Sequence, residues 1–282
     1  CVGILLLGRR IERTLEILNW ILGVVILGGF LALDLVLVAP ETWMAGAAGF
    51  LGLDLRNADF RLLPAGADFF LIGALAGYSG AGGVINITLA NWARDKGYGM
   101  GQLAGYIPAV IGGHRVPLAH TGFRFTPDPE SMARWRGWWR IVRVDQWGIY
   151  FTGAVLGMAL PALLYVTFVP AGSDIRGLGI AAALAEALAS RGAVLALVVA
   201  TLGGWILFKT QLDILDGMTR AITDILWTGN RRLRARQGAD VRVVYYGVLA
   251  AVVIWGVIAM RFTQPIILLQ LGANMAGVVF II

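Results

Sequence analysis

Cysteine and histidine are nearly missing from this sequence. It holds one cysteine, Cys1, and two histidines, His114 and His120, among its 282 residues. A single cysteine excludes a disulfide bridge within the chain, and two histidines exclude a metal site built from several imidazoles. Any metal ion bound by these residues must therefore rely on side-chain oxygens, backbone carbonyls, methionine sulfur or groups from outside the chain.

The sequence also lacks the short motifs that mark common catalytic sites. It contains no phosphate-binding P-loop, no HExxH, no GxSxG and no paired Cys/His spacing typical of a zinc site. The glycines at Gly97, Gly99 and Gly101 follow an apolar run and no predicted strand, which argues against a dinucleotide-binding loop. We therefore expect no enzymatic activity and no resident cofactor.

Charge is scarce, whereas hydrophobic residues are abundant. Charged residues make up 14% of the chain, 58% of residues are hydrophobic, and the mean hydropathy is +0.75. Soluble domains carry about a quarter charged residues, and a membrane-spanning helix needs about 20 apolar residues. The pattern predicts an all-α polytopic membrane protein with a single transmembrane domain. Its expected helices cover residues 14–39, 69–92, 146–169, 193–216, 243–261 and 264–282.

The two ends of the sequence suggest that more chain exists. The sequence opens on Cys1, without an initiating methionine, and it ends inside an apolar run at Ile282. We therefore expect it to be a fragment of a longer membrane protein.

Basic residues are unevenly distributed between the expected loops. The segment before residue 14 and the segments 92–145 and 215–242 hold seventeen Lys and Arg, whereas the alternate segments hold five. Because Lys and Arg concentrate in cytoplasmic loops, we expect these three segments to face the cytoplasm, and we place the chain in a bacterial plasma (inner) membrane. Asp34 then lies near the outer end of its helix, where its carboxylate can reach water.

Tryptophan and arginine are interleaved between residues 134 and 147. Such a patch is compatible with nucleic-acid binding or with an amphipathic stretch at the inner membrane face. The second interpretation is favoured, because tryptophan is enriched at membrane interfaces and basic amphipathic helices lie there. We expect membrane lipids and no nucleic acid as partners, and partner chains are not predicted. The residues are Arg134, Trp135, Arg136, Trp138, Trp139, Arg140, Arg143 and Trp147.

A glycine-rich stretch interrupts the expected helix 69–92 near its middle. Five of the eleven residues from Gly73 to Gly83 are glycine, and polar residues stand among and after them. Within a bilayer, a broken helix is tolerated only where its freed backbone groups line a cavity or bind a ligand. The alternative is close helix packing through small residues four apart, such as Gly73 and Gly77. The polar neighbours favour a functional break near residues 77–83.

Two pairs of polar residues have helical i,i+4 spacing within apolar helices. Lys209 and Asp213 are interpreted as an ion pair near the interface, with a proton relay as the alternative. Gln270 and Asn274 share one face of the last expected helix. They either hydrogen-bond to a neighbouring helix or line a pathway, and the sequence leaves both interpretations open.

Four stretches, taken in order, resemble the Nramp family of divalent metal transporters. Residues 8–28 (GRRIERTLEILNWILGVVILG) are similar to the entry into that family's fifth helix, and residues 71–97 (LIGALAGYSGAGGVINITLANWARDKG) to its glycine-opened sixth helix. Residues 201–226 (TLGGWILFKTQLDILDGMTRAITDIL) resemble its eighth helix, and residues 266–277 (IILLQLGANMAG) its tenth. The resemblance implies helices five to ten of a leucine-transporter-like inverted-repeat fold (APC superfamily). The first helix, where the family keeps a metal-binding Asp and Asn, would lie outside this chain.

The resemblance implies secondary active transport of a divalent metal cation bound at the break. Family members typically carry Met-Pro-His there, whereas this sequence has Gly80, Ala81 and Gly82. The departure removes the sulfur that favours Mn²⁺ or Fe²⁺ and the histidine linked to proton coupling, so that carbonyl and amide oxygens suited to harder ions such as Mg²⁺ are left. By resemblance, the transported-ion site comprises Gly77, Tyr78, Ser79, Gly80, Ala81, Gly83, Asn86, Gln270 and Asn274.

Two other functions stay open at this stage. The same fold could carry an organic solute such as an amino acid, whose carboxylate would face a half-helix N-terminus at the break. Alternatively, the protein is a membrane sensor or scaffold that kept the fold without its ligands.

Overall fold

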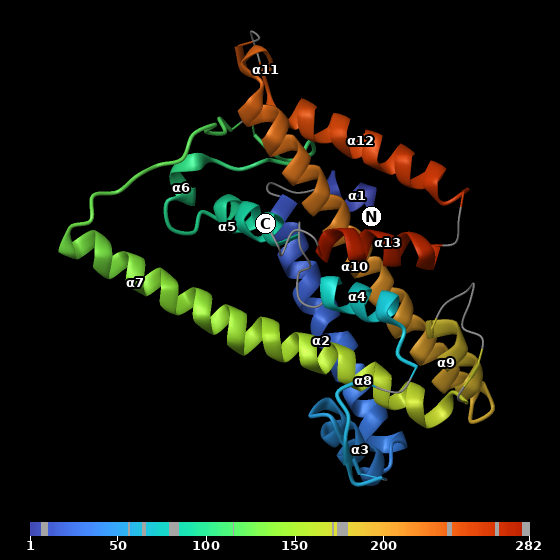
Figure 1. Cartoon of the computed structure of the whole chain (residues 1–282). Coiled ribbons are helices and arrows are strands. Elements are labelled where there is room, and N and C mark those ends of the chain that lie inside the picture. Colours follow the sequence, from blue (N-terminus) through green and yellow to red (C-terminus); the bar gives the residue numbers. More distant parts are fainter. Residues whose placement is uncertain are drawn as a thin grey trace. The chain divides into compact units, whose positions relative to one another are not determined.

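A computed structural model of the chain describes residues 1–6, 11–55, 57–63, 66–78, 85–114, 116–170, 172–173, 180–235, 239–262 and 265–277. Helices dominate these residues, which confirms the predicted all-α class (Figure 1). In chain order the elements are α1 (Val2–Leu5), α2 (Ile11–Leu37), α3 (Pro40–Phe50), β1 (Leu53–Asp54), β2 (Asp59–Phe60), α4 (Phe69–Tyr78), α5 (Ile85–Asp95), α6 (Gly101–Ala104), α7 (Pro129–Arg143), the π-helix η1 (Val144–Phe151), α8 (Thr152–Phe168), α9 (Ile180–Ala189), α10 (Ala193–Gly229), α11 (Arg231–Ala235), α12 (Val241–Ala259) and α13 (Pro265–Gly277). The two short strands pair antiparallel.

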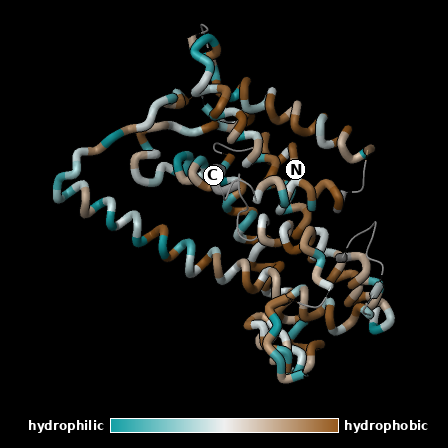
Figure 2. The backbone as a smooth tube through the Cα atoms, viewed as in Figure 1, coloured by the Kyte–Doolittle hydropathy of each residue, from teal (hydrophilic) through white to brown (hydrophobic). Residues whose placement is uncertain are grey.

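Four helices among the described residues are long and apolar enough to cross a membrane. They are α2, the continuous helix Pro129–Phe168 formed by α7, η1 and α8, and the helices α10 and α12. Large apolar side chains are exposed along them: Val36 on α2 is 80% exposed and Val243 on α12 is 74% exposed. Figure 2 shows hydrophobic residues recurring along α10 and α12. Such surfaces are suited to lipid, which covers apolar side chains without the cost that water imposes.

Two of the observed helices extend well beyond the expected spans. The expected helix 146–169 begins at Pro129, and the expected helix 193–216 continues to Gly229. At 1.5 Å per residue, α10 is about 55 Å long, whereas the hydrocarbon core is about 30 Å thick. The apolar run of α10 ends at charged residues, but the helix continues past them. These charged residues form ion pairs with buried partners, which are described below.

The remaining expected spans correspond to shorter helices. The expected helix 69–92 contains α4 and α5, and the expected helix 264–282 contains α13. Residues 79–84 and 278–282 lie outside the described residues.

The chain divides into two compact units. The first unit comprises residues 1–20, 73–148 and 209–282. Its hydrophobic core gathers side chains from α1, the start of α2, the segment 107–118, the second half of α10, and α12. These core residues are Leu5, Ile11, Leu15, Ile107, Ala109, Leu118, Leu212, Leu215, Trp227, Val241, Tyr245 and Leu249.

The second unit comprises residues 21–72 and 149–208. Within it, the short helices α3 and α9 both contact α8. Gly29 on α2 lies against Leu202 on α10, where an added Cβ would be 3.0 Å from the leucine side chain. This unit has a core made almost entirely of aliphatic side chains.

Candidate functional site

The structure describes the glycine-rich stretch 73–83 only as far as Tyr78. α4 ends at Tyr78 and α5 begins at Ile85. Of the predicted site, Ser79, Gly80, Ala81 and Gly83 lie outside the described residues, and so do the side chains of Tyr78 and Asn86. The break between residues 77 and 83 therefore stays a prediction.

The helix α4, which contains the described part of this stretch, packs closely against α13 in the first unit (Figure 1). A Cβ added to Gly73 would lie 2.5 Å from Oδ1 of Asn274, and a Cβ added to Gly77 would lie 2.3 Å from the carbonyl oxygen of Ala273. Real Cβ atoms do not approach so closely, so only glycine permits this contact. The small-residue packing that the sequence offered as an alternative is thus present at Gly73 and Gly77. It is compatible with a break that begins after Gly77.

Asn274 and Gln270 lie on α13 one turn apart. The Asn274 amide donates to the Gln270 backbone carbonyl, with Nδ2 and O separated by 2.9 Å, and its Oδ1 faces Gly73. Both side chains are half-buried. The structure therefore brings Gly77 and Asn274 of the predicted site to the same helix contact, with Asn274 at the level of Gly73. The role of Gln270 as an ion ligand stays a prediction.

Lys209 and Asp213 form the ion pair that their spacing predicts. Lys209 Nζ lies 3.1 Å from Asp213 Oδ2, and the Asn19 amide on α2 donates to Asp213 Oδ1 at 2.7 Å. The two charged side chains are half-buried, being 34% and 21% exposed. The pair thus joins α10 to α2 within the first unit, as expected of an ion pair, and the proton-relay alternative is not tested.

The structure contains a group of buried charged residues that was not predicted as a site, and it begins about one turn past Asp213 on α10. Asp216 accepts hydrogen bonds from Trp92 Nε1 at 2.6 Å, from Arg220 Nε at 2.7 Å and from the Tyr245 hydroxyl at 2.7 Å. Arg220 also donates through Nη1 to Asp95 at the end of α5. Arg220, Asp216 and Tyr245 are each fully buried. Charges so far from water are tolerated only when they are paired and hydrogen-bonded, which this arrangement achieves across α5, α10 and α12.

Three consecutive residues, the last two of α5 and the one that follows it, each have a charged partner on another helix. Arg94 Nη1 lies 2.6 Å from Asp224, Asp95 pairs with Arg220, and Lys96 Nζ lies 3.0 Å from Glu16 on α2. Burial disfavours the charge on Arg94, but Asp95 and Asp224 outweigh this effect and raise the pKa of its guanidinium. This triplet therefore holds the carboxyl end of α5 against α10 and α2.

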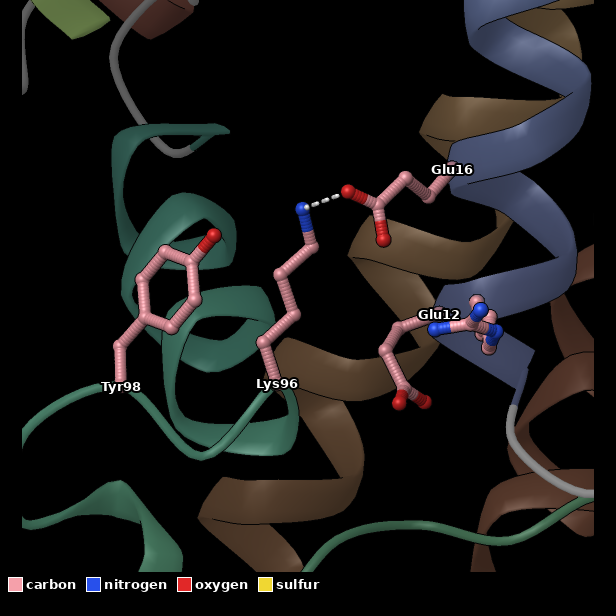
Figure 3. Close-up of a pocket in the computed structure, with 5 residues that line it drawn as sticks. Glu12, Glu16, Lys96 and Tyr98 are labelled. Atoms are coloured by element: carbon pink, nitrogen blue, oxygen red, sulfur yellow. Dashed lines mark hydrogen bonds and ion pairs between the residues drawn. The ribbon is translucent and has the colours of Figure 1, made fainter.

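A pocket of about 440 Å³ opens beside the Lys96 pair (Figure 3). In Figure 3, Lys96 reaches from the turn after α5 towards Glu16, with the ring of Tyr98 on its other side. Glu12 comes from the turn of α2 that precedes Glu16, and Arg13 completes the lining. The lining carries two carboxylates and two cationic groups, so the pocket has no excess of charge of either sign.

The interior around the buried charges contains further polar atoms without a hydrogen-bond partner in the described part of the chain. Both donors and acceptors occur, and both kinds together are what ordered water satisfies. The buried charged residues are three aspartates and two arginines, so that their formal charge is −1; they are Asp95, Asp216, Asp224, Arg94 and Arg220. The unpartnered atoms are Arg94 Nη2, Arg220 Nη2, Asn91 Nδ2, Thr219 Oγ1, Thr223 Oγ1 and Asp224 Oδ1.

The structure corrects the expectation that the Asp34 carboxylate reaches water. Its side chain is fully buried, and neither carboxylate oxygen has a partner among the described residues. The expectation that it reaches water is therefore wrong. The reason is its register, because Asp34 lies on the same buried stripe of α2 as Ile26 and Phe30, which faces the core of the second unit.

The fold and these contacts define an all-α integral membrane protein with a buried polar group in its first unit. Among the described residues, no group of three or more His, Cys, Asp and Glu side chains is arranged to hold a metal ion. No family model matches the chain, and neither does any curated protein or solved structure.

One sequence signal could have indicated the buried charges. Asp216, Arg220 and Asp224 repeat every four residues, which places alternating charges on one helix face. The apolar run ends at this point, so the expected helix ended there as well. Asp95 lies 125 positions from Arg220, and no local pattern links the two.

Proposed function

We propose that the chain forms part of a secondary active transporter of divalent metal cations, similar to the Nramp family. The observation that carries the proposal is the backbone contact between Gly77 on α4 and Ala273 on α13. It holds the last turn of α4, within the glycine-rich stretch, against the helix that bears Gln270 and Asn274. Carbonyl groups from a broken helix and amide oxygens from a neighbouring helix form the type of mid-membrane cation site that such transporters use.

The ligand types available here fit a hard divalent cation. Backbone carbonyls and amide oxygens bind Mg²⁺ and similar ions, whereas thiolate, thioether and imidazole ligands select softer metals. Gln270 supplies the amide oxygen in this proposal. In this proposal, a helix that corresponds to the family's first helix supplies the carboxylate that balances the charge of the ion.

The charged triplet at the end of α5 would act as the inner closure of the pathway. Arg94, Asp95 and Lys96 hold α5 to α10 and α2 through three ion pairs. Movement of α5 during alternating access would require these pairs to separate. Their charges lie on the side of the bilayer that the distribution of basic residues predicts to be cytoplasmic.

The proposal is tested by ion uptake into proteoliposomes that contain the full-length protein. Uptake of Mn²⁺, Mg²⁺ and Ca²⁺ is measured separately, and we expect Mg²⁺ to be taken up and Gln270→Ala to lower the rate at least tenfold. The matched control is Gln102→Ala, the same substitution at an exposed position on α6, which should leave uptake unchanged.

The results distinguish this proposal from its alternatives. No uptake of any of the three ions overturns cation transport and leaves the scaffold interpretation. Uptake of an amino acid without uptake of these ions favours the organic-solute alternative. Equal rates for Gln270→Ala and Gln102→Ala would contradict the assignment of Gln270 as a ligand.

A further inference from the structure

The helix α7 presents three different faces. Trp138 contacts Tyr98 of the same unit, with ring centroids 5.3 Å apart. Trp135 and Trp139 stack edge-to-face at 5.7 Å and are 43% and 47% exposed. Trp138 therefore faces the protein, whereas the other two tryptophans, which we call the tryptophan stripe, face outwards.

Three arginines form a third face, which we call the arginine stripe. Arg136, Arg140 and Arg143 are exposed, and none has an ion-pair partner among the described residues. At 100° per residue, they fall within about 60° of one another and on the side of α7 opposite Trp138. By contrast, Arg134 pairs with Glu130 one turn earlier. The arginine stripe is thus a row of uncompensated positive charge directed away from the protein.

The start of α7 is fixed by a strong cap. Asp128 accepts from the Ser131 backbone N–H at 2.8 Å and from its hydroxyl at 2.9 Å, and Pro129 occupies the first helical position. The helix then continues without interruption from Pro129 to Phe168. Rotation of the arginine stripe about the helix axis is therefore set by the helix itself and by the contact at Trp138.

This continuity places the arginine stripe beside the membrane surface. The apolar run of the same helix begins at Trp147, just past Arg143. Along the axis, Arg143 lies about 6 Å before Trp147 and Arg136 about 16 Å before it, and the polar headgroup layer on each side of a bilayer is about 5–8 Å thick. Arg143 therefore lies at the depth of the headgroups, and the stripe continues outwards from there. Guanidinium groups at this depth meet the phosphates of lipid headgroups, and exposed tryptophans at the same level are typical of the interface.

We propose that the arginine stripe binds the phosphate groups of anionic phospholipids in the leaflet that α7 borders. Arginine donates two parallel hydrogen bonds to a phosphate, and a headgroup such as phosphatidylglycerol keeps its net negative charge. Phosphatidylcholine carries a compensating cation, so it is attracted less. The tryptophan stripe, which lies at the level of the arginines, packs beside the headgroup of the bound lipid.

Lipid retention measured by native mass spectrometry tests this proposal. The full-length protein is delipidated in detergent and mixed with equal concentrations of phosphatidylglycerol and phosphatidylcholine. We expect the wild type to retain phosphatidylglycerol preferentially. Arg136, Arg140 and Arg143 are replaced together by Gln, and the preference should fall by about fivefold for each arginine. This factor corresponds to the attraction of about 1 kcal/mol between one basic residue and an anionic membrane surface.

A second triple variant serves as the control for net charge. Arg124, Arg231 and Arg232 are also exposed, and replacing them by Gln changes the charge equally but leaves the arginine stripe intact. This variant should keep the preference for phosphatidylglycerol. Equal loss in both triple variants, or equal retention of the two lipids by the wild type, would overturn the proposal.

Two competitors identify the ligand source. Glycerol phosphate in solution should not displace the bound lipid, since it lacks the acyl chains that contact the apolar run after Trp147. Short single-stranded RNA should bind the wild type and the stripe variant equally weakly. Displacement of lipid by glycerol phosphate at the same concentration, or RNA binding that depends on the arginine stripe, would contradict the assignment to a membrane lipid.

Discussion

Arg220 offers the sharpest test of the buried charges. Replacement by Met keeps a long side chain but removes the guanidinium that bridges Asp216 and Asp95. Breaking a buried ion pair by removing one partner costs about 3–5 kcal/mol. Both carboxylates keep other donors, because Trp92 and Tyr245 still donate to Asp216 and the Ile107 N–H and Arg94 still donate to Asp95. We therefore expect a loss near the lower limit, about 3 kcal/mol.

Thermal inactivation in detergent measures this loss. For chains of this size, 1 kcal/mol corresponds to about 2–4 °C, so Arg220→Met should lower the Tm by roughly 6–12 °C. The purified full-length protein is heated at one fixed rate, and the monodisperse fraction that survives is quantified by size-exclusion chromatography. A fixed rate is needed because membrane-protein unfolding of this kind is often irreversible.

Two comparison variants make the result interpretable. Arg220→Lys keeps the charge but cannot bridge two carboxylates with a planar fork, so its Tm should lie between those of the wild type and Arg220→Met. Arg124→Met replaces an exposed arginine and should change the Tm by less than about 2 °C. If Arg220→Met also melts within that margin, the guanidinium does not hold the buried carboxylates and the reasoning is refuted.

Three further predictions follow from individual contacts. Gly77→Ala forces α4 away from the Ala273 carbonyl on α13 and should lower the Tm. Gly256→Ala, where an added Cβ meets no atom within 4 Å, should raise the Tm slightly, because alanine is more favourable than glycine in a helix by about 1 kcal/mol. Equal Tm shifts for the two variants would contradict the close packing at Gly77. Tyr245→Phe removes the hydroxyl that donates to Asp216 on α10 and should lower the stability by about 1–3 kcal/mol. The loss is measured as a decrease in Tm, and an unchanged Tm would show that this hydrogen bond contributes nothing. Asp34→Leu replaces a polar group that has no described partner in an apolar core by an apolar one and should raise the Tm. A marked decrease would show that the carboxyl group has a stabilising partner.

Local patterns were sufficient for much of the fold. The apolar runs predicted helices that the structure contains as α2, α8, α10 and α12, because an amide backbone in lipid must satisfy its hydrogen bonds within the segment. The i,i+4 spacing also predicted the ion pair of Lys209 and Asp213, which depends only on neighbouring turns of one helix. These features are local, so hydropathy and spacing are enough to find them.

Residues distant in the sequence explain where the prediction was incomplete. α10 continues past residue 216 because Asp95 and Arg94 neutralise its charges from another helix. Asp34 is buried because of how α2 is rotated within the second unit, and hydropathy along one segment does not report that rotation. Gly73 and Gly77 are packed against Asn274 and Ala273, which the spacing of glycines allowed but could not assign to a particular neighbour.

The sequence by itself determined that this is an all-α membrane protein and where most of its long helices lie, since each helix must bury its own backbone hydrogen bonds and present apolar side chains to lipid. The tertiary structure alone decided which charges are paired in the interior and which glycine faces contact which helix. Some of those contacts join segments more than a hundred residues apart. Their energies depend on how the helices are rotated and packed, which no local pattern specifies.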